Sequence, residues 1–372
     1  MNTEQIYTLV NGVNAQAFGN QALTVVDAQG LIALGNVVLS SSTNTENFLN
    51  TLLQRIGRTI MDYRRYRNRL SDMVLDDFQY GAILQKIKIK MPEAVTDPAY
   101  DLTDGQSVDP WVIYKPDVVQ KLFVTRTPYM FAQTISRHLL KEAFTSAEAM
   151  GGFISSVMGE MRNAVEVSLE NLGHIAIANM IAEANGTARV VNLVTEYNAA
   201  VNPPTPLTAA TALFDPAFLA YAVRRINETF DMMQSLTSLF NDGSVERFTP
   251  REDMRVKVLS RFQRAAQTVV EYAAFHDELV SIDNGYETLP FWQSAQTPAS
   301  IHVERSSDGT ETTIANIIAV VHDRDALGIY QIDEEVQTSG LNPRGLYYTT
   351  FMHERQLWFN DLSENFIAFT LN

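Results

Sequence analysis

The chain has 372 residues, of which 46% are hydrophobic, so it is long enough to form one elaborate subunit or two or three compact units around a substantial core. Its 28 Lys and Arg against 43 Asp and Glu give a net charge of −15, which disfavours tight nonspecific binding to nucleic-acid phosphates. The absence of cysteine excludes disulfides, thiolate metal sites and thiol catalysis. No secretory signal pattern and no apolar run near the roughly 20 residues of a membrane span are present, so we expect a cytosolic protein without a membrane partner.

The N-terminal segment predicts an extended arm followed by a basic helix. Residues 1–45 are rich in Asn, Gln, Ser and Thr and show no sustained period, which is typical of an extended arm. From Glu46 to Leu75 apolar residues recur at helical spacing, with arginines between them. Nearby acidic residues and a scarcity of aromatic ones favour a subunit contact or a solvated face over DNA binding for this helix. Its candidate contact residues are Arg55, Arg58, Arg64 and Arg65.

The next segment predicts a long two-stranded arm with an acidic tip. In residues 85–91 every second residue is Lys and the residues between are Gln, Ile or Met, so the lysines are expected on one solvent-exposed face of a strand. A turn-rich acidic excursion follows Pro92, and residues 118–125 form a second β-prone stretch. Because two strands alone bury too little surface to be stable in water, we expect the arm to lie on a neighbour. The residues expected at that contact are Lys86, Lys88, Lys90, Asp97, Asp101 and Asp104.

Two long helices are predicted next. Residues 146–184 contain no proline and carry a helical apolar pattern, with Ser146 as the N-cap and Gly186 as the left-handed stop. A second helix begins at Asp215-Pro216 and is expected to end at residues 241–243. Shorter elements then alternate, which indicates an α+β protein. They are an extended segment at 254–259, a helix at 261–275, and extended segments at 314–321, 345–359 and 365–371.

No strong catalytic signature is present in the chain. It lacks a phosphate-binding loop, a nucleophile elbow, a zinc-protease motif and a dinucleotide fingerprint. His322, Asp323 and Asp325 are the residues from which a nuclease-type metal site could be imagined. Charged residues where strands end are usually solvated, so we expect no catalytic residue, no metal and no cofactor, with a metal-dependent enzyme as the alternative.

The order of these elements resembles the Hong Kong 97-type capsid fold. In sequence, residues 321–325, 342–348 and 366–369 resemble the C-terminal part of major capsid proteins from small short-tailed phages of Gram-positive hosts. A weaker likeness covers residues 116–153. The most family-like positions are Asp323, Asp325, Asn342, Pro343, Arg344 and Gly345.

This resemblance implies an α+β subunit divided into five segments. They are an N-terminal arm and basic helix (1–75), an E-loop (76–130), a P-domain with a spine helix (131–190), an A-domain (191–320) and returning strands (321–372). Some members of this group carry a further immunoglobulin-like domain after the aromatic strands, and we expect none here because the sequence stops at Asn372.

The function that the resemblance implies is that of a major capsid protein. Hexamers and pentamers of the chain would form the icosahedral head around double-stranded DNA, assembled in the host cytoplasm and retained in the virion. Its expected partners are itself, a scaffold protein, a portal at one vertex, and packaged DNA by weak nonspecific contact only. A bacterial nanocompartment shell protein of the same fold is the alternative, and the phage-type C-terminal segment argues against it.

Overall fold

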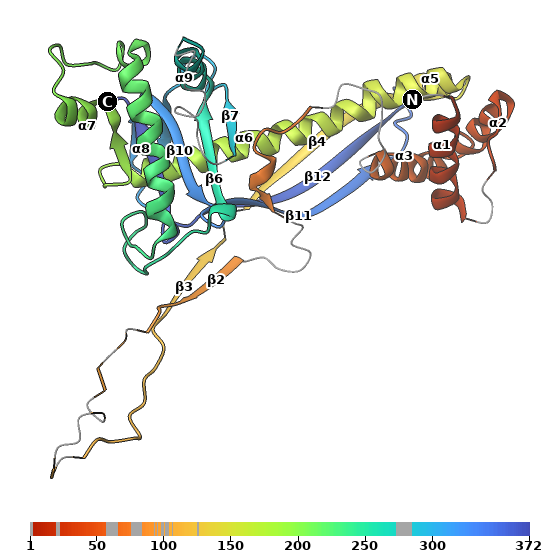
Figure 1. The fold of residues 1–372 in the computed structure, drawn as a ribbon. Coiled ribbons are helices and arrows are strands. Elements are labelled where there is room, and N and C mark those ends of the chain that lie inside the picture. The colour runs from red at the N-terminus through yellow and green to blue at the C-terminus, as the bar shows by residue number, and fades with distance from the viewer. Residues whose placement is uncertain are drawn as a thin grey trace. The chain divides into compact units, whose positions relative to one another are not determined.

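A computed structural model describes most of the chain, which divides into two compact units (Figure 1). The described residues are 3–19, 23–56, 66–75, 84–92, 94, 96–97, 100, 104–105, 107–124, 126–272 and 285–372. Unit 1 comprises Met1–Tyr80, Arg126–Gly173 and Ile329–Leu357, and unit 2 comprises Gly81–Thr125, His174–Gly328 and Trp358–Asn372.

The N-terminal part of unit 1 is helical. It contains α1 (Thr3–Phe18), α2 (Ala28–Val38) and α3 (Ser42–Ile56). In α1 the apolar residues from Ile6 to Val13 are buried at the spacing of a helix that faces a core. The prediction of an extended arm over residues 1–45 is therefore wrong for the described residues, because a few well-spaced apolar side chains outweigh a polar composition.

The predicted basic helix is confirmed only in its first part. Helix α3 ends at Ile56, and residues 57–65 lie outside the described part of the chain. Residues 66–75 are not helical: they contain a 3₁₀ turn and the short strand β1 (Val74–Leu75). That segment pairs with a strand of the unit 1 sheet, which replaces the helical hydrogen bonds.

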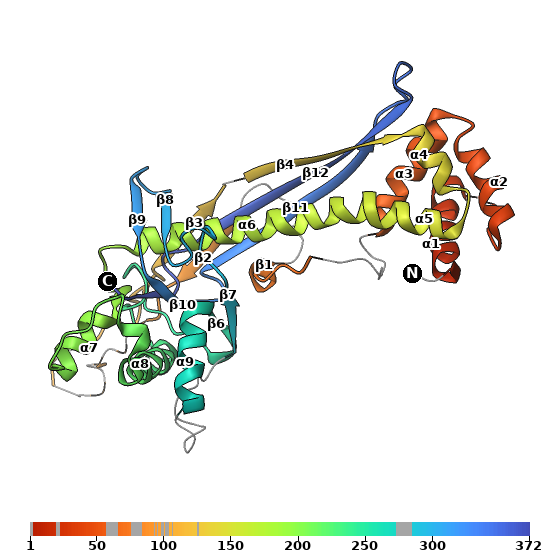
Figure 2. The same ribbon diagram turned by 90° about the horizontal axis from the view of Figure 1, so that it is seen from above.

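A four-stranded sheet lies in unit 1, in the order β1-β11-β12-β4. Its long strands are β4 (Arg126–Ser136), β11 (Leu327–Thr338) and β12 (Tyr347–Asn360), which Figure 2 shows side by side. Strands β12 and β4 are antiparallel. The short helix α4 (Arg137–Ala143) follows β4 directly.

The predicted long helix is confirmed. It consists of α5 (Ala147–Phe153), a π-helical segment (Ile154–Met158) and α6 (Gly159–Ala184). The Ser146 side chain caps α5 by accepting a hydrogen bond from the Ala149 amide, and Gly186 has a φ of 78° after the last turn.

Unit 2 is built on a five-stranded sheet in the order β5-β13-β10-β6-β7. Its strands are β5 (Val190–Asn192), β6 (Met254–Leu259), β7 (Tyr286–Leu289), β10 (Ile317–Asp323) and β13 (Phe366–Thr370). Every residue of β10 and β13 is buried, as expected of strands covered on both faces. The core also includes side chains from α7 (Leu193–Val201), α8 (Pro216–Gln234) and α9 (Ser260–Tyr272).

Two predicted boundaries in unit 2 are wrong. Helix α8 starts at the Asp215 cap as predicted but ends at Gln234, because residues 235–249 form a loop closed by a bridge between Thr237 and Arg247. The predicted strand at 314–321 is divided at Asn316, which has a φ of 58°. Strand β9 (Glu311–Ile314), which pairs with β8 (Ile301–Glu304), ends before Asn316, and β10 begins after it.

The two-stranded arm is confirmed as an antiparallel hairpin. Strand β2 (Leu84–Ile89) pairs with β3 (Val118–Phe123), with Leu84 opposite Phe123 and Ile89 opposite Val118. Figure 1 shows the hairpin and the described residues beyond it extending away from the rest of unit 2.

Candidate functional site: the charged root of the hairpin

The β2–β3 hairpin has its lysines turned inward and its isoleucines turned outward. Lys88 is 6% exposed, whereas Ile87 and Ile89 are 60% and 59% exposed. On β3, Val118 and Leu122 are also exposed. The expectation of a solvent-exposed lysine face is therefore wrong, because acidic residues elsewhere in unit 2 cover that face.

Lys88 is the centre of the covered face. Its Nζ lies 2.8 Å from Oδ2 of Asp361 and 2.7 Å from Oε1 of Glu364. The same ammonium donates a hydrogen bond of 2.5 Å to the Ser363 hydroxyl. Three oxygen acceptors thus replace the water that Lys88 loses on burial.

The other two lysines of this face continue the network along the hairpin. Lys121 lies directly across the strands from Lys86, so both side chains point to the same side. The Nζ of Lys121 lies 2.8 Å from Oδ2 of Asp242 and 3.4 Å from Oδ1 of Asp361. Lys86 donates to the Asp325 carbonyl, and its Nζ lies 4.4 Å from the centre of the Phe359 ring.

The acidic partners are held by the turn between β12 and β13. The amide of Asp361 donates to the Ala326 carbonyl, and its Oδ1 accepts hydrogen bonds from the Ser363 amide and hydroxyl. Glu364 is held by Arg247, whose Nε and Nη2 donate to the two carboxylate oxygens over 2.9 and 2.6 Å. These contacts hold the carboxylates of Asp361 and Glu364 in fixed positions independently of the hairpin lysines.

The pKa shifts of these groups follow from competition between burial and pairing. Burial by itself raises the pKa of Asp361, but hydrogen bonds from Lys88 and Ser363 and the charges of Lys88 and Lys86 outweigh it and lower the pKa to about 2. The pKa of Glu364 is lowered in the same way, since Arg247 and Lys88 overcome the effect of burial. For Lys86, desolvation prevails over its acidic neighbours and lowers the pKa.

We name this set the root cluster: Lys86, Lys88, Lys121, Arg247, Asp242, Asp361 and Glu364. Removing one partner of a buried ion pair typically costs 3–5 kcal/mol, roughly, because the remaining charge stays buried without compensation. The cluster therefore fixes the orientation of the hairpin on unit 2. The charged groups of the cluster pair with one another, and such pairing suits the anchoring of the hairpin.

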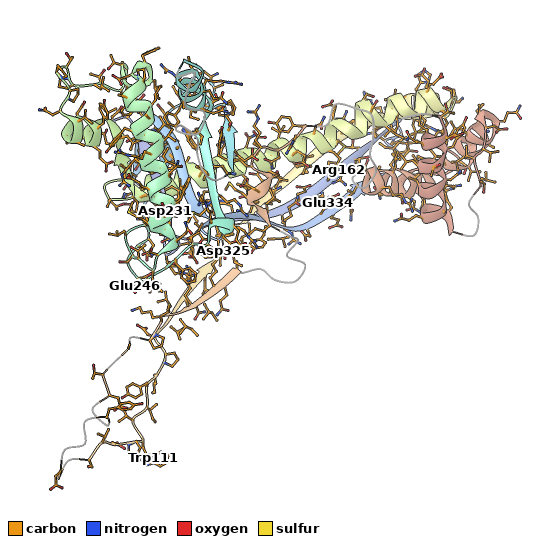
Figure 3. All side chains as sticks on the ribbon, viewed as in Figure 1. Trp111, Arg162, Asp231, Glu246, Asp325 and Glu334 are labelled. Carbon is orange, nitrogen blue, oxygen red and sulfur yellow. The ribbon has the colours of Figure 1, made fainter. Side chains whose placement is uncertain are left out.

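The remaining residues predicted at the arm are exposed. Lys90 forms a solvent-exposed ion pair of 2.7 Å with Asp117 at the end of the paired strands. Asp97 and Asp104 are exposed in the loop, and Asp101 lies outside the described residues. Large apolar side chains stand beside them, including Trp111, whose position far out on the arm is shown in Figure 3.

Among the arginines predicted to touch DNA or a subunit, Arg55 is described. Its Nε donates to Oε1 of Gln16, so this guanidinium contacts α1. Arg58, Arg64 and Arg65 lie outside the described residues.

The family-like C-terminal residues form turns. Asp323 accepts hydrogen bonds from the Thr249 hydroxyl and the Asp325 amide. His322 is buried, and its Nδ1 contacts the Asp323 carbonyl. In the part of the chain that the structure describes, no group of three or more His, Asp or Glu residues could hold a metal ion.

The turn at residues 342–346 is ordered by the Asn342 side chain. Its Oδ1 accepts from the amides of Arg344 and Gly345, and its Nδ2 donates to the Tyr347 hydroxyl. Pro343 lies inside this turn, and a Cβ on Gly345 would stand 2.4 Å from the Tyr347 ring. These residues shape the end of the β11–β12 hairpin.

Sequence reasoning missed five members of the root cluster, including Lys121. The hairpin register places Lys121 opposite Lys86, so a correct pairing would have found it. Asp361 and Glu364 sit in a short polar turn between two strongly β-prone stretches, a signal that predicts the turn but not the burial of its carboxylates. Asp242 and Arg247 carry no local signal, since only the tertiary fold brings them to the hairpin.

The fold is that of a phage capsid subunit. The chain is similar to a chain in the capsid structure of Staphylococcus phage Andhra, with a TM-score of 0.56, 9% identity, and coverage of 84% of this chain and 87% of the other. It is also similar to a chain in the structure of the head fiber and inner core protein gp22 of bacteriophage P68, with a TM-score of 0.52, 10% identity and the same coverages. The α+β architecture is accordingly the Hong Kong 97-type capsid fold.

Residues 10–370 match the model of the Phi29-like phage major capsid protein family, and the chain belongs to this family. The major capsid protein of Bacillus phage GA-1 is 24% identical over 368 residues, which are 98% of this chain and 69% of the relative. That of Bacillus phage B103 is 22% identical over 98% of this chain and 72% of the relative. The resemblance found in the sequence is confirmed, and the nanocompartment alternative is not favoured.

Among the described helices, none is both long and apolar enough to cross a bilayer.

Proposed function

We propose that this phage capsid protein assembles with copies of itself into hexamers and pentamers that tile an icosahedral head around double-stranded DNA. Identical subunits that meet through head-to-tail contacts close into rings when the rotation between them allows it. Assembly in the host cytoplasm, a scaffold protein, a portal at one vertex and weak contact with packaged DNA complete the proposal. The protein acts by its contacts and catalyses no reaction, which fits a site whose charged groups are paired internally.

The observation that carries this proposal is the exposed apolar face of the β2–β3 hairpin. Ile87, Ile89, Val118 and Leu122 lie on one side of two paired strands and are all exposed. A contiguous apolar surface of this kind on a soluble subunit marks a contact with another protein. In a shell built from one chain, the partner is a second copy of that chain.

The loop beyond the hairpin extends the proposed contact. Trp111, Ile113 and Tyr114 are each more than 80% exposed, and Asp97 and Asp104 lie in the same loop. Aromatic residues are the side chains most enriched at the centres of protein interfaces, and acidic residues suit the rim. Lys90 remains a proposed rim residue, whereas Lys86 and Lys88 support the contact indirectly by anchoring the hairpin.

The experiment compares shell formation by the wild type and by the Ile87→Glu variant, purified from recombinant cells and mixed with candidate scaffold protein. Negative-stain microscopy and size-exclusion chromatography of the wild type should show closed shells, tubes or rings. Ile87→Glu should remain a subunit with an unchanged circular dichroism spectrum, because the substitution places a charge in the proposed interface without touching the root cluster.

Val201→Glu is the matched control. Val201 is 52% exposed at the end of α7, so the same change of an exposed apolar side chain to a carboxylate occurs outside the hairpin. This variant should assemble as the wild type does. Normal shells from Ile87→Glu would refute the hairpin contact, and a wild type that stays a monomer under all conditions would refute the shell itself.

A further inference from the structure

A buried carboxyl group lies in the middle of the unit 1 sheet. Glu354 on β12 is 2% exposed, and its Oε1 has no hydrogen-bond partner among the described residues. Its other oxygen accepts a hydrogen bond of 2.9 Å from the Gln356 side chain. A buried ionised carboxylate with one unsatisfied oxygen is costly, so the protonation state of this group matters to the fold.

A second carboxylate faces Glu354 across the sheet. Thr338 contacts Thr350, and Arg355 binds Asp333, which fixes the register between β11 and β12. In that register Glu334 lies directly opposite Glu354. Like charges at directly opposite positions of neighbouring strands repel, and here one of the two is buried.

A guanidinium close to the pair binds Glu334. Arg162 on α6 donates from Nη1 and Nη2 to the two oxygens of Glu334 over 2.8 and 2.6 Å, and Nη2 also contacts the Leu53 carbonyl. Figure 3 shows Arg162 on α6 and Glu334 on β11. The guanidinium is thus directed at Glu334, and it donates no hydrogen bond to Oε1 of Glu354, which has no partner among the described residues.

Among the described residues, the other titratable groups near Glu354 that are named below do not neutralise it. Glu166, one turn along α6 from Arg162, adds a third carboxylate, and Tyr129 is the cross-strand neighbour on β4. The named groups therefore comprise three carboxylates and one guanidinium, a net charge of −2 if all were ionised. Binding one proton at the most buried carboxyl removes the repulsion at the least cost.

We propose that Glu354 is a proton-binding site that couples the packing of α6 against the unit 1 sheet to pH. The carboxyl group holds a proton while helix and sheet are packed and releases it when they separate. The inference goes beyond the proposed capsid function and does not depend on it, because it concerns the folding equilibrium of the single subunit.

The direction of the coupling follows from the pKa. Burial, followed by the charge of Glu334, raises the pKa of Glu354 from 4.5 to about 7 against the opposing effects of Gln356 and Arg162. The folded state therefore holds one more proton than the unfolded state between pH 4.5 and about 7. The stability from this group is fully present below pH 4.5 and is lost as the pH rises to about 7.

The test measures urea unfolding of the unassembled full-length chain from pH 5 to pH 9, for the wild type and for Glu354→Gln. The amide keeps the shape and cannot ionise. The unfolding constant of the wild type, divided by that of the variant, should rise about tenfold per pH unit up to about pH 7 and then level off. Comparing the two chains cancels the titration of all shared groups, and a ratio that is independent of pH would overturn the proposal.

Two further variants separate this coupling from a general effect of charge. Glu335→Gln, an exposed neighbour on β11, should leave the wild-type pH dependence unchanged. Glu334→Gln should move the transition to lower pH, because it removes the repelling charge and frees Arg162 to pair with Glu354. If Glu354→Gln fails to fold, the pH dependence of Glu334→Gln still tests the proposal. A transition at the same pH as in the wild type would contradict it.

Discussion

Replacing Asp361 by asparagine removes one charge from the centre of the root cluster and keeps the shape of the side chain. The pKa of this carboxyl falls from 3.8 in the unfolded chain to about 2 in the fold. At about 1.4 kcal/mol per pH unit, its ionised form is stabilised by roughly 2 kcal/mol relative to its protonated form. Asn keeps part of the hydrogen bonding and leaves Lys88 with one carboxylate partner, so we expect Asp361→Asn to cost about 2–3 kcal/mol at pH 7.

The sign of the pH dependence is set by the lowered pKa. The contribution of Asp361 is fully present above pH 3.8 and is lost as the pH falls towards about 2. Urea unfolding of the unassembled subunit at pH 7, 4 and 3 should therefore show a constant difference between the variant and the wild type at the first two values and a smaller one at the third. Hydrogen exchange should also accelerate in the β2–β3 amides of the variant, because the anchored root opens more often.

Asp117→Asn on the same hairpin is the control for this prediction. Asp117 pairs with Lys90 at 2.7 Å, but both side chains are well exposed, so its loss should cost less than about 1 kcal/mol. If Asp361→Asn proves no more destabilising than Asp117→Asn, burial and pairing in the root cluster do not hold the hairpin in the way described.

Two further predictions test unit 1 and unit 2 separately. A Cβ on Gly35 would lie 2.6 Å from Cβ of Phe144, so Gly35→Ala should lower the free energy of unfolding by about 1–3 kcal/mol in urea titrations, whereas Gly152→Ala, with open space around it, should raise it slightly. If both alanine variants behave alike, α2 is not packed in the free subunit. Asp215→Ala removes the cap that accepts from the Phe218 amide at 2.9 Å and should cost about 1 kcal/mol, and an unchanged thermal transition would contradict that role.

Elements with strong local signals could be predicted from the sequence. The start of α8 was predicted because Asp215-Pro216 combines a cap with a first-turn proline, and the hairpin strands were predicted because their residues alternate. The family assignment followed from residues near the C-terminus and is confirmed. These signals depend only on near neighbours in the chain.

The orientation of the hairpin could not be predicted in this way. Alternation shows that Lys88 and Ile87 lie on opposite faces, but it does not show which face is covered. That choice depends on Asp361 and Glu364, which are more than 270 residues away from Lys88 in the chain. In α1 the opposite error occurred, since a polar composition concealed a short buried stripe.

The β2–β3 hairpin, with its lysines buried and its isoleucines exposed, suggests how one element can serve both stability and the proposed assembly. A face of buried ion pairs is specific in geometry, because each Lys needs its own carboxylates, so it fixes the direction of the arm. An apolar face is non-directional and tolerates adjustment, which suits the contact that we propose between copies of the chain in pentamers and hexamers. With the lysines outward instead, the subunit would be more soluble. The arm would then lose both the ion pairs of the root cluster and the exposed apolar face. Buried lysines and exposed isoleucines therefore fit an arm that is held in place by its own chain and contacts a second copy through its apolar face.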